Sequence, residues 1–320
     1  MTLFTRIVTH WGPFHADDVL SVAVLRTLAP EAKVVRTRDP ALLREAAADP
    51  ATALVDVGHV SDPALNNFDH HQADFSEARP DGVPYASIGL VWRTWGLTYV
   101  RRLLEGAGGS VPDEAVAFVH GRVDRRLIAC VDAYDCGAVR VAAHVPRPDG
   151  RDAGVYMFTV SDLVAALVPA SGDEAALAAA FEGAVEVAER ALRDQVAQSA
   201  EVWRFLAQVR EADDGGPVLC LPVAGPWREH VLPHHRCVVF PAPGASDWLA
   251  QVVTEPDDVS FPPRQRASFP ASWGGAPAER LRELTGVADV TFCHRALFIA
   301  GAQSRDGALR LARQAVALAP

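Results

Sequence analysis

The sequence predicts an α/β protein, with a parallel sheet in its N-terminal part and a smaller α+β domain at its C-terminus. Three observations lead to this fold class. Apolar strand-like and helix-like segments alternate through residues 5–57, which is the rhythm of a parallel sheet. A long Ala-rich helical segment follows in the middle of the chain, and short β-rich segments dominate the rest. The length of 320 residues also exceeds what one core usually holds, so more than one domain is expected.

The N-terminal part is predicted to run strand, helix, strand, helix, strand, with the strands at 5–10, 33–38 and 51–57 and the helices at 19–30 and 40–48. In parallel sheets, ligands collect beyond the carboxyl ends of the strands. His10 ends the first predicted strand, and Asp56 lies at the end of the third. The triplet Asp69-His70-His71 follows in the next connection, so we expect all of these residues on one edge.

The rest of the chain is predicted to contain helices followed by a β-rich end. The expected helices are 86–95, an amphipathic segment at 113–135, an Ala-rich segment at 173–211, and 306–318. The expected strands are 218–223, 237–240, 248–253, 290–293 and 297–299. Pro146–Gly154 is the best candidate for a linker. We therefore expect three parts, at residues 1–145, 146–215 and 216–320.

Composition limits the classes of protein to which the chain can belong. An apolar content of 49% and a charged content of 22% are those of an ordinary globular protein. No stretch is long and apolar enough to cross a bilayer and no secretory signal is present, so we expect a cytoplasmic protein without a membrane partner. The net charge of −10 opposes a broad basic surface for nucleic acid, but it permits a groove where cations neutralise phosphates. The five cysteines form no CxxC pair, which argues against zinc fingers and disulfides.

Histidines and aspartates gather at the predicted carboxyl edge of the sheet. The set comprises His10, His15, Asp17, Asp56, Asp69, His70, His71 and Asp132. Any one of them could be a cap or a surface residue, and we interpret the neighbouring Asp18 as a helix cap. Together, imidazoles and several carboxylates without a cysteine favour Mn²⁺ or Mg²⁺. The carboxylates exceed the needs of one ion, so we expect two ions bridged by a carboxylate, an arrangement found in phosphoester hydrolysis.

Two further pairs of residues need an interpretation. Asp132 and Asp135 lie three apart near the end of a predicted helix, so they share a face. Carboxylates at a helix C-terminus are unfavourable unless a cation lies nearby. His234 and His235 form a second adjacent pair, but we expect no carboxylates near them and therefore no metal site.

The order of these residues resembles the DHH phosphoesterase superfamily, and in detail its Myg-type family of metal-dependent hydrolases and exonucleases. The main matching stretches are Thr9–Asp18 (THWGPFHADD), Val35–Asp39 (VRTRD), Val55–Gly58 (VDVG), Phe68–Gln72 (FDHHQ), Val131–Gly137 (VDAYDCG) and Phe298–Leu309 (FIAGAQSRDGAL). The resemblance spans almost the whole chain. It implies a DHH phosphoesterase-like catalytic domain at 1–145, joined through the helical region 146–215 to a substrate-binding domain at 216–320.

The resemblance also implies roles for individual residues. The implied metal ligands are His10, His15, Asp17, Asp56, His70 and Asp132, with Asp135 as the alternative to Asp132. Asp56 would bridge two ions, Asp69 would orient an imidazole, and His71 would contact the substrate phosphate as a donor or acid. The candidates to bind phosphate are Arg36, Arg38, His294, Ser304 and Arg305. Surface ion pairing remains the alternative for Arg36 and Arg38.

Two positions depart from the family pattern. Cys136 stands where an asparagine is usual, which leaves open which of the two nearby aspartates binds metal. Gln303 replaces a lysine and removes a charge that would neutralise phosphate, which leaves the substrate class open.

Three functions are compatible with these residues. The leading hypothesis is a two-metal phosphodiesterase, a 3′→5′ exonuclease on RNA or short oligonucleotides that uses two Mn²⁺ ions or, as a substitute, Mg²⁺. The first alternative is a hydrolase of small phosphorylated molecules such as pyrophosphate or a cyclic dinucleotide, which the acidic net charge favours. The second alternative is a metal-binding regulatory protein without catalysis. The sequence does not indicate whether the protein forms an oligomer.

Overall fold

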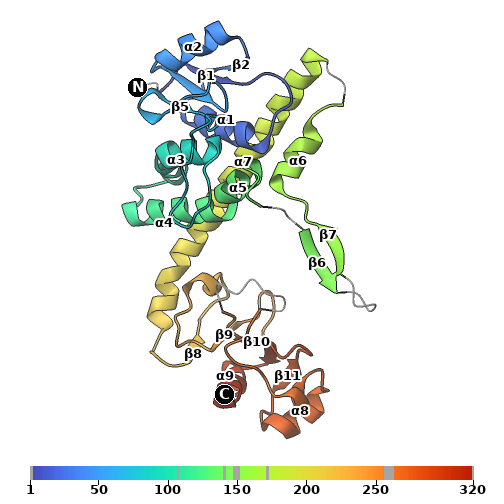
Figure 1. Ribbon diagram of the computed structural model, residues 1–320. Coiled ribbons are helices and arrows are strands. Elements are labelled where there is room, and N and C mark those ends of the chain that lie inside the picture. Colours follow the sequence, from blue (N-terminus) through green and yellow to red (C-terminus); the bar gives the residue numbers. More distant parts are fainter. Residues whose placement is uncertain are drawn as a thin grey trace. The chain divides into compact units, whose positions relative to one another are not determined.

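The computed structural model describes residues 3–106, 108–139, 142–146, 152–170, 173–255 and 263–318 (Figure 1). The chain divides into two compact units, residues 1–200 and 201–320. The boundary falls inside the long helix α7 (Glu174–Ala212), which was predicted to within one residue at each end. The expected mixed α/β composition is confirmed. The division of the chain into three functional domains stays a prediction.

The first unit is built on a five-stranded sheet in the order β2-β1-β3-β5-β4. Its strands are β1 (Arg6–Thr9), β2 (Lys33–Arg36), β3 (Thr52–Val55), β4 (Ser61–Asp62) and β5 (Asn67–Phe68). Every neighbouring pair is parallel except β4 and β5, so the predicted parallel sheet is confirmed. Because parallel strands end at the same edge, the residues that follow β1, β3 and β5 meet there.

Helices cover both faces of this sheet. The helices of the first unit are α1 (Ala16–Leu28), α2 (Pro40–Ala48), α3 (Ser87–Gly106), α4 (Asp113–Val123), α5 (Ala129–Asp135), α6 (Val160–Leu167) and the first part of α7. On one face, Ala46 of α2 packs with Val8 and Leu54. On the other face, Ile7 and Val55 join the main core with residues of α1 and α3. Successive strand residues thus point to opposite faces, as the alternation of a strand requires.

Two helices differ from their predicted extent. The segment at 113–135 is helical as predicted, but a π-helical turn at Asp124–Ile128 joins α4 to α5. Helix α3 continues well past the predicted end at residue 95. It runs through Gly96, where a Cβ would lie only 2.7 Å from the ring of His120 on α4. That ring stacks on Trp92, with the centroids 5.2 Å apart, so close helix packing needs the glycine.

Both ends of the linker predicted at 146–154 belong to β-strands. Strands β6 (Ala142–Pro146) and β7 (Asp152–Tyr156) pair with each other in an antiparallel ladder. Residues 147–151 lie outside the described residues. The prediction was wrong because the Pro and Gly residues that indicate a linker also occur where strands end.

The second unit contains a mixed five-stranded sheet in the order β11-β12-β10-β9-β8. Its elements are β8 (Val218–Cys220), β9 (Cys237–Pro241), β10 (Trp248–Val252), α8 (Ala278–Thr285), β11 (Val290–Cys293), β12 (Ile299–Ala302) and α9 (Arg305–Ala317). Only β8 and β9 are parallel. Strand β12 begins where the predicted strand ends, because Leu297 has a positive φ of 60° and belongs to a turn. Short 3₁₀ turns lie at Pro63–Leu65, Trp227–His230 and Ala271–Trp273.

Across the described ranges, no helix combines the length and the apolar character needed to cross a membrane.

Candidate metal centre

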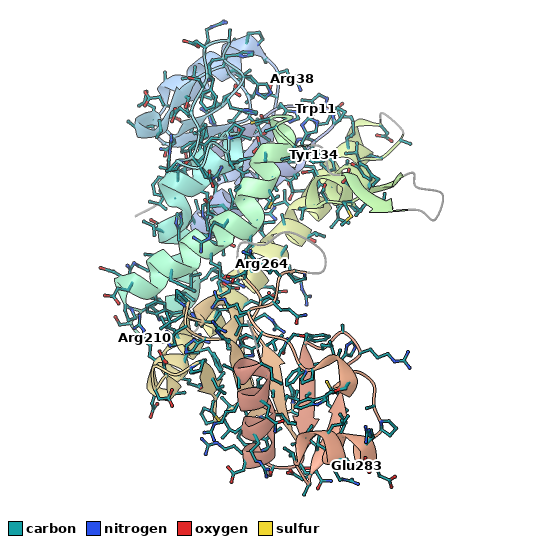
Figure 2. The ribbon with its side chains drawn as sticks, turned by 60° about the horizontal axis from the view of Figure 1, so that its bottom comes forward. Trp11, Arg38, Tyr134, Arg210, Arg264 and Glu283 are labelled. Atoms are coloured by element: carbon teal, nitrogen blue, oxygen red, sulfur yellow. The ribbon has the colours of Figure 1, made fainter. Side chains whose placement is uncertain are left out.

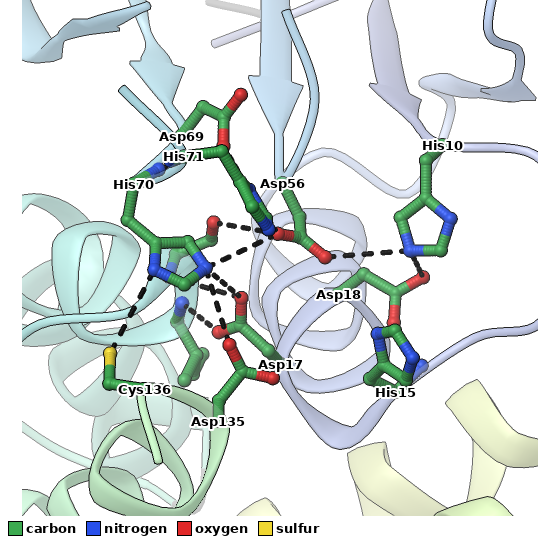
Figure 3. Close-up of polar contacts among 12 residues, drawn as sticks. His10, His15, Asp17, Asp18, Asp56, Asp69, His70, His71, Asp135 and Cys136 are labelled. Atoms are coloured by element: carbon green, nitrogen blue, oxygen red, sulfur yellow. Dashed lines mark hydrogen bonds and ion pairs between the residues drawn. The ribbon is translucent and has the colours of Figure 1, made fainter. Parts of the chain in front are cut away.

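Asp56 lies at the centre of a cluster of histidines and aspartates beyond the carboxyl ends of β1, β3 and β5 (Figure 3). Its Oδ2 is 3.4 Å from Nε2 of His10. Its Oδ1 is 3.5 Å from Nε2 of His70 and 3.4 Å from Nδ1 of His71. The residue has a φ of 55°, a conformation uncommon outside glycine and enriched at functional sites. The two oxygens of one carboxylate therefore face two different groups of histidines.

His70 faces several carboxylates with one ring nitrogen. Its Nε2 is 3.2 Å from Oδ2 of Asp135 and 3.8 Å from Oδ2 of Asp17, in addition to the contact with Asp56. Its Nδ1 lies 3.8 Å from Sγ of Cys136, and that thiol donates to the carbonyl of Tyr85 at 3.6 Å. Nε2 of His70 therefore faces three carboxylates, whose negative charge a proton on that nitrogen or a bound cation would balance.

His10 and His15 form the other side of the cluster. One nitrogen of each ring and one oxygen of Asp56 lie within 4.8 Å of one another. Oδ2 of Asp18 is 3.3 Å from Nε2 of His10, while its Oδ1 accepts the backbone N–H of His15 at 2.7 Å. The interpretation of Asp18 as a cap of α1 is confirmed, but the same side chain also belongs to the cluster. Sequence reasoning missed this second role because a cap pattern says nothing about the other carboxylate oxygen.

Backbone N–H groups hold the carboxylate of Asp17 in place. It accepts from the N–H of Ser87 at 3.1 Å and of Ile88 at 2.6 Å, both in the first turn of α3. The N-terminus of a helix favours a negative charge, so this arrangement fixes a carboxylate that is completely buried.

Asp69 is fixed in the same manner and in turn fixes His71. It accepts the N–H of His59 at 2.6 Å and that of His70 at 2.8 Å. Nδ1 of His71 lies 2.7 Å from the same carboxylate. Because this bond places the ring proton on Nδ1, Nε2 of His71 keeps a lone pair. About half of the His71 side chain is exposed, so that nitrogen is accessible to a ligand.

Asp132 and Asp135 do not occupy the same environment. Asp135 contacts His70, whereas Oδ2 of Asp132 lies 2.7 Å from Nη1 of Arg79 and its Oδ1 accepts the N–H of Gly89 at 3.0 Å. Burial raises the pKa of Asp132 to about 7 despite the neighbouring Arg79 guanidinium. The structure thus brings Asp135 into direct contact with His70 and pairs Asp132 with an arginine that sequence reasoning had not singled out.

Buried atoms without partners show that the cluster fits a cation. Within the described part of the chain, the buried atoms Nε2 of His10, Nε2 of His70 and Oδ2 of Asp18 have no hydrogen-bond partner. Burial, followed by the charges of Asp56 and Asp135, raises the pKa of Asp17. Burial opposes protonation of His70, but its contacts with Asp135 and Asp56 outweigh this effect and raise its pKa. The site needs positive charge, and its oxygen and imidazole donors suit a divalent cation.

The two arginines near the edge of the sheet differ in position. Arg38 lines a cavity of about 140 Å³ together with His10, His15 and His71, and its Nη2 lies 3.3 Å from Nδ1 of His10. The guanidinium of Arg36 instead lies 4.2 Å from the ring centroid of Phe181, and Arg36 donates to a backbone carbonyl in the loop before α1. The structure therefore places Arg38 beside the cluster and gives Arg36 a packing role.

The three remaining candidates belong to the second unit, where each has a local role. Ser304 caps α9 by accepting the N–H of Gly307 at 3.0 Å. Nε of Arg305 donates to Sγ of Cys220 at 3.2 Å. The ring of His294 lies 4.7 Å from that of Phe298. Their assignment to phosphate binding stays a prediction.

The expectation that His234 and His235 have no carboxylate nearby is wrong. Oδ1 of Asp213 lies 3.2 Å from Nε2 of His234 and 3.1 Å from Nε2 of His235. Asp213 is far from both in the chain and directly follows the end of α7.

The fold and the cluster together define an α/β protein with a candidate divalent-metal centre at the carboxyl edge of a largely parallel sheet. Residues 6–316 match the model of the MYG1 exonuclease family, which is described as an uncharacterised protein family (UPF0160), and the chain belongs to this family.

Similar proteins in animals and fungi carry the same family name. The MYG1 exonuclease of Homo sapiens is 30% identical over 339 residues, which cover 98% of this chain and 86% of the human protein. The MYG1 exonuclease of Mus musculus is 30% identical over 344 residues, which cover 98% of this chain and 86% of the mouse protein. A MYG1 protein of Schizosaccharomyces pombe is 29% identical over 332 residues, which cover 99% of this chain and 98% of the yeast protein.

Proposed function

We propose that this protein is a metal-dependent phosphodiesterase that removes nucleotides from RNA or short oligonucleotides in the 3′→5′ direction. The observation that carries the proposal is the position of Asp56, whose two oxygens face His10 on one side and His70 on the other. A carboxylate in this position is suited to bridge two ions. The exonuclease names of the human and mouse relatives support the reaction class. Membership of the DHH phosphoesterase superfamily and a cytoplasmic location are part of the same proposal.

Two groups of side chains around Asp56 would hold the ions. One group is His10, His15 and Asp56, with Asp18 in contact with His10. The other is Asp17, Asp56, His70 and Asp135. The balance of oxygen over nitrogen donors favours Mn²⁺ or Mg²⁺. When bound, such ions supply the Lewis acidity that polarises a phosphodiester. Asp132 would act indirectly, because it pairs with Arg79 and accepts from the backbone of α3.

Three side chains around the cluster would act on the substrate itself. Nε2 of His71 points its lone pair away from Asp69, so it can hold a proton for the leaving oxygen once protonated. Asp69 keeps that ring in one orientation and one tautomer. Arg38 lines the cavity beside His71 and offers a guanidinium to a phosphate oxygen.

A hydrolase of small phosphorylated molecules is the second candidate. The net charge of −10 favours it, because a small substrate needs no basic track along the surface. The two functions share one metal centre and differ only in what extends from the phosphate.

A substrate panel tests the proposal. End-labelled RNA oligonucleotides, pyrophosphate and a cyclic dinucleotide would be incubated with the protein and Mn²⁺, with EDTA as the metal-free control. We expect mononucleotides to be released from the 3′ end of RNA, and His70→Ala to abolish the reaction. His234→Ala is the matched control, because it removes an exposed member of the other histidine pair and should leave the rate unchanged. Rapid hydrolysis of pyrophosphate or the cyclic dinucleotide alone would favour the second candidate, and no turnover of any substrate would contradict both.

A further inference from the structure

A large apolar cavity adjoins the metal centre in the first unit. It has a volume of about 720 Å³ and is lined by charged residues and Leu127 of the π-helical turn and by mostly apolar residues of α5 and the start of α6. A smaller cavity of about 320 Å³ contains the cluster residues His15, Asp56, His71 and Asp135. Tyr134 and Ser161 line both cavities. A ligand with its phosphate at the cluster would therefore reach the apolar cavity with whatever is attached to that phosphate.

The π-helical turn supplies a second reason to regard this cavity as functional. Four consecutive residues, from Asp124 to Leu127, line it. Turns of this π-helical type occur frequently at functional sites. Arg125 and Arg126 in this turn are exposed and carry positive charge at the cavity.

Tyr134, which is labelled in Figure 2, lines both cavities. Its hydroxyl is 3.0 Å from Oδ1 of Asp162 and 3.2 Å from the hydroxyl of Tyr156, and these contacts hold the end of the side chain. It directly precedes Asp135, which contacts His70. An aromatic ring held beside a phosphate-processing centre is a suitable surface on which a base can stack.

We propose that this cavity binds the nucleoside of the terminal nucleotide, with its base beside Tyr134 and its phosphate at the metal centre. The inference rests on the proposed phosphodiesterase function and specifies its substrate as a nucleotide. The volume lies within the range of about 300–1,000 Å³ that is usual for small-molecule pockets. The cavity offers apolar walls, an aromatic ring, three arginines, two aspartates and the hydroxyl of Ser161, which together can contact a base and a ribose. Pyrophosphate would leave this cavity empty.

Binding of two phosphomonoesters tests the inference without any catalytic step. AMP and ribose 5-phosphate, which contain no phosphodiester bond, would be titrated calorimetrically into the full chain in the presence of Mn²⁺. Because the two ligands differ only in the base, we expect AMP to bind about tenfold more tightly, as base stacking on an aromatic side chain allows. Equal affinities in the wild-type protein would overturn the inference.

A matched pair of substitutions tests whether the preference for AMP over ribose 5-phosphate arises in this cavity. Ala129 lines the cavity, so Ala129→Phe should fill it and remove the preference for AMP. Ala179→Phe adds the same side chain at an exposed position of α7 and should leave the preference intact. A folded Ala129→Phe protein that still prefers AMP would overturn the inference. If that protein also hydrolysed RNA as the wild type does, the proposed phosphodiesterase function would stand and only the assignment of this cavity would fall.

Alkylation of Cys130 provides a readout that needs no variant, in case Ala129→Phe does not fold. The thiol is exposed and lines the cavity. AMP should slow its reaction with iodoacetamide severalfold, as followed by mass spectrometry, whereas ribose 5-phosphate should not. Equal rates with both ligands would overturn the inference. Protection by AMP in a protein that hydrolyses no phosphodiester would leave the cavity assigned and refute the proposed function.

Discussion

The two adjacent histidine pairs of this chain look alike in the sequence but differ in their chemistry. His235 accepts the N–H of Leu232 on Nδ1 at 2.9 Å, so its Nε2 must carry the proton that faces Asp213. Both nitrogens are then satisfied, and Nε2 has no lone pair to offer to a metal. His70 is the reverse case, because its buried Nε2 faces several carboxylates and finds no hydrogen-bond partner in the described part of the chain. His235 thus has both ring nitrogens in hydrogen bonds, whereas Nε2 of His70 faces a group of carboxylates.

The largest expected difference between the two regions concerns activity. Asp56→Asn removes a charge from the proposed bridging carboxylate, and we expect hydrolysis of RNA with Mn²⁺ to fall by more than about 100-fold. Asp213→Asn makes the same change beside the other histidine pair and should alter the rate less than twofold. Initial rates at saturating substrate measure both. A similar loss in the two variants would break the comparison.

The next largest expected effect is on stability, where Gly89 of α3 packs against Asp132 beside the candidate metal centre. A Cβ at Gly89 would lie 2.0 Å from Oδ2 of Asp132, so Gly89→Ala must displace that side chain or the helix that carries it. Overpacking of this kind costs about 1–3 kcal/mol of unfolding free energy. Gly183→Ala is the control, because a Cβ in that part of α7 meets no atom within 4 Å and should stabilise the helix by up to about 1 kcal/mol. Urea denaturation of both variants measures the contrast, and equal stabilities would contradict it.

The group formed by Asp213, His234 and His235 in the second unit, called the clamp below, should contribute to stability and not to activity. His235→Ala removes the hydrogen bond in which the part-buried N–H of Leu232 donates to Nδ1, which costs about 0.5–1.5 kcal/mol of unfolding free energy. His71→Ala should show the opposite pattern, a large loss of activity with little loss of stability, because His71 is half exposed. Thermal unfolding and hydrolysis rates of the two variants would be compared. A loss of activity in His235→Ala at full stability would contradict the assignment.

The smallest expected effect is the pH dependence of the clamp. The N–H of Gly215, followed by His234 and His235, lowers the pKa of Asp213 to about 2. A carboxylate whose pKa is lower in the folded state stabilises the fold above its unfolded pKa of about 3.9, and this contribution disappears as the pH falls towards about 2. The difference in Tm between the wild type and Asp213→Ala, both in EDTA, should shrink as the pH falls below about 4. A difference that grows on acidification would contradict this sign.

The parallel sheet and most of the histidines and aspartates that gather at its carboxyl edge could be predicted from the sequence, because strand ends and apolar periodicity are local properties. The environment of each carboxylate could not. Asp132 and Asp135 share a predicted helix face, yet the contact of Asp132 with Arg79 depends on a loop far away in the chain. Asp213 reaches the second histidine pair through a contact that no local pattern indicates. The π-helical turn could not be predicted either, because the apolar periodicity of the surrounding helix does not mark it.

Counting bound manganese tests the central claim most directly. The claim is that Asp56 joins two ion sites in the first unit, whereas the second histidine pair holds none. Equilibrium titration with Mn²⁺ should give two ions per chain for the wild type and for Asp213→Asn, and at most one for Asp56→Asn. Binding that is lost in Asp213→Asn, or that is unchanged in Asp56→Asn, would contradict the account.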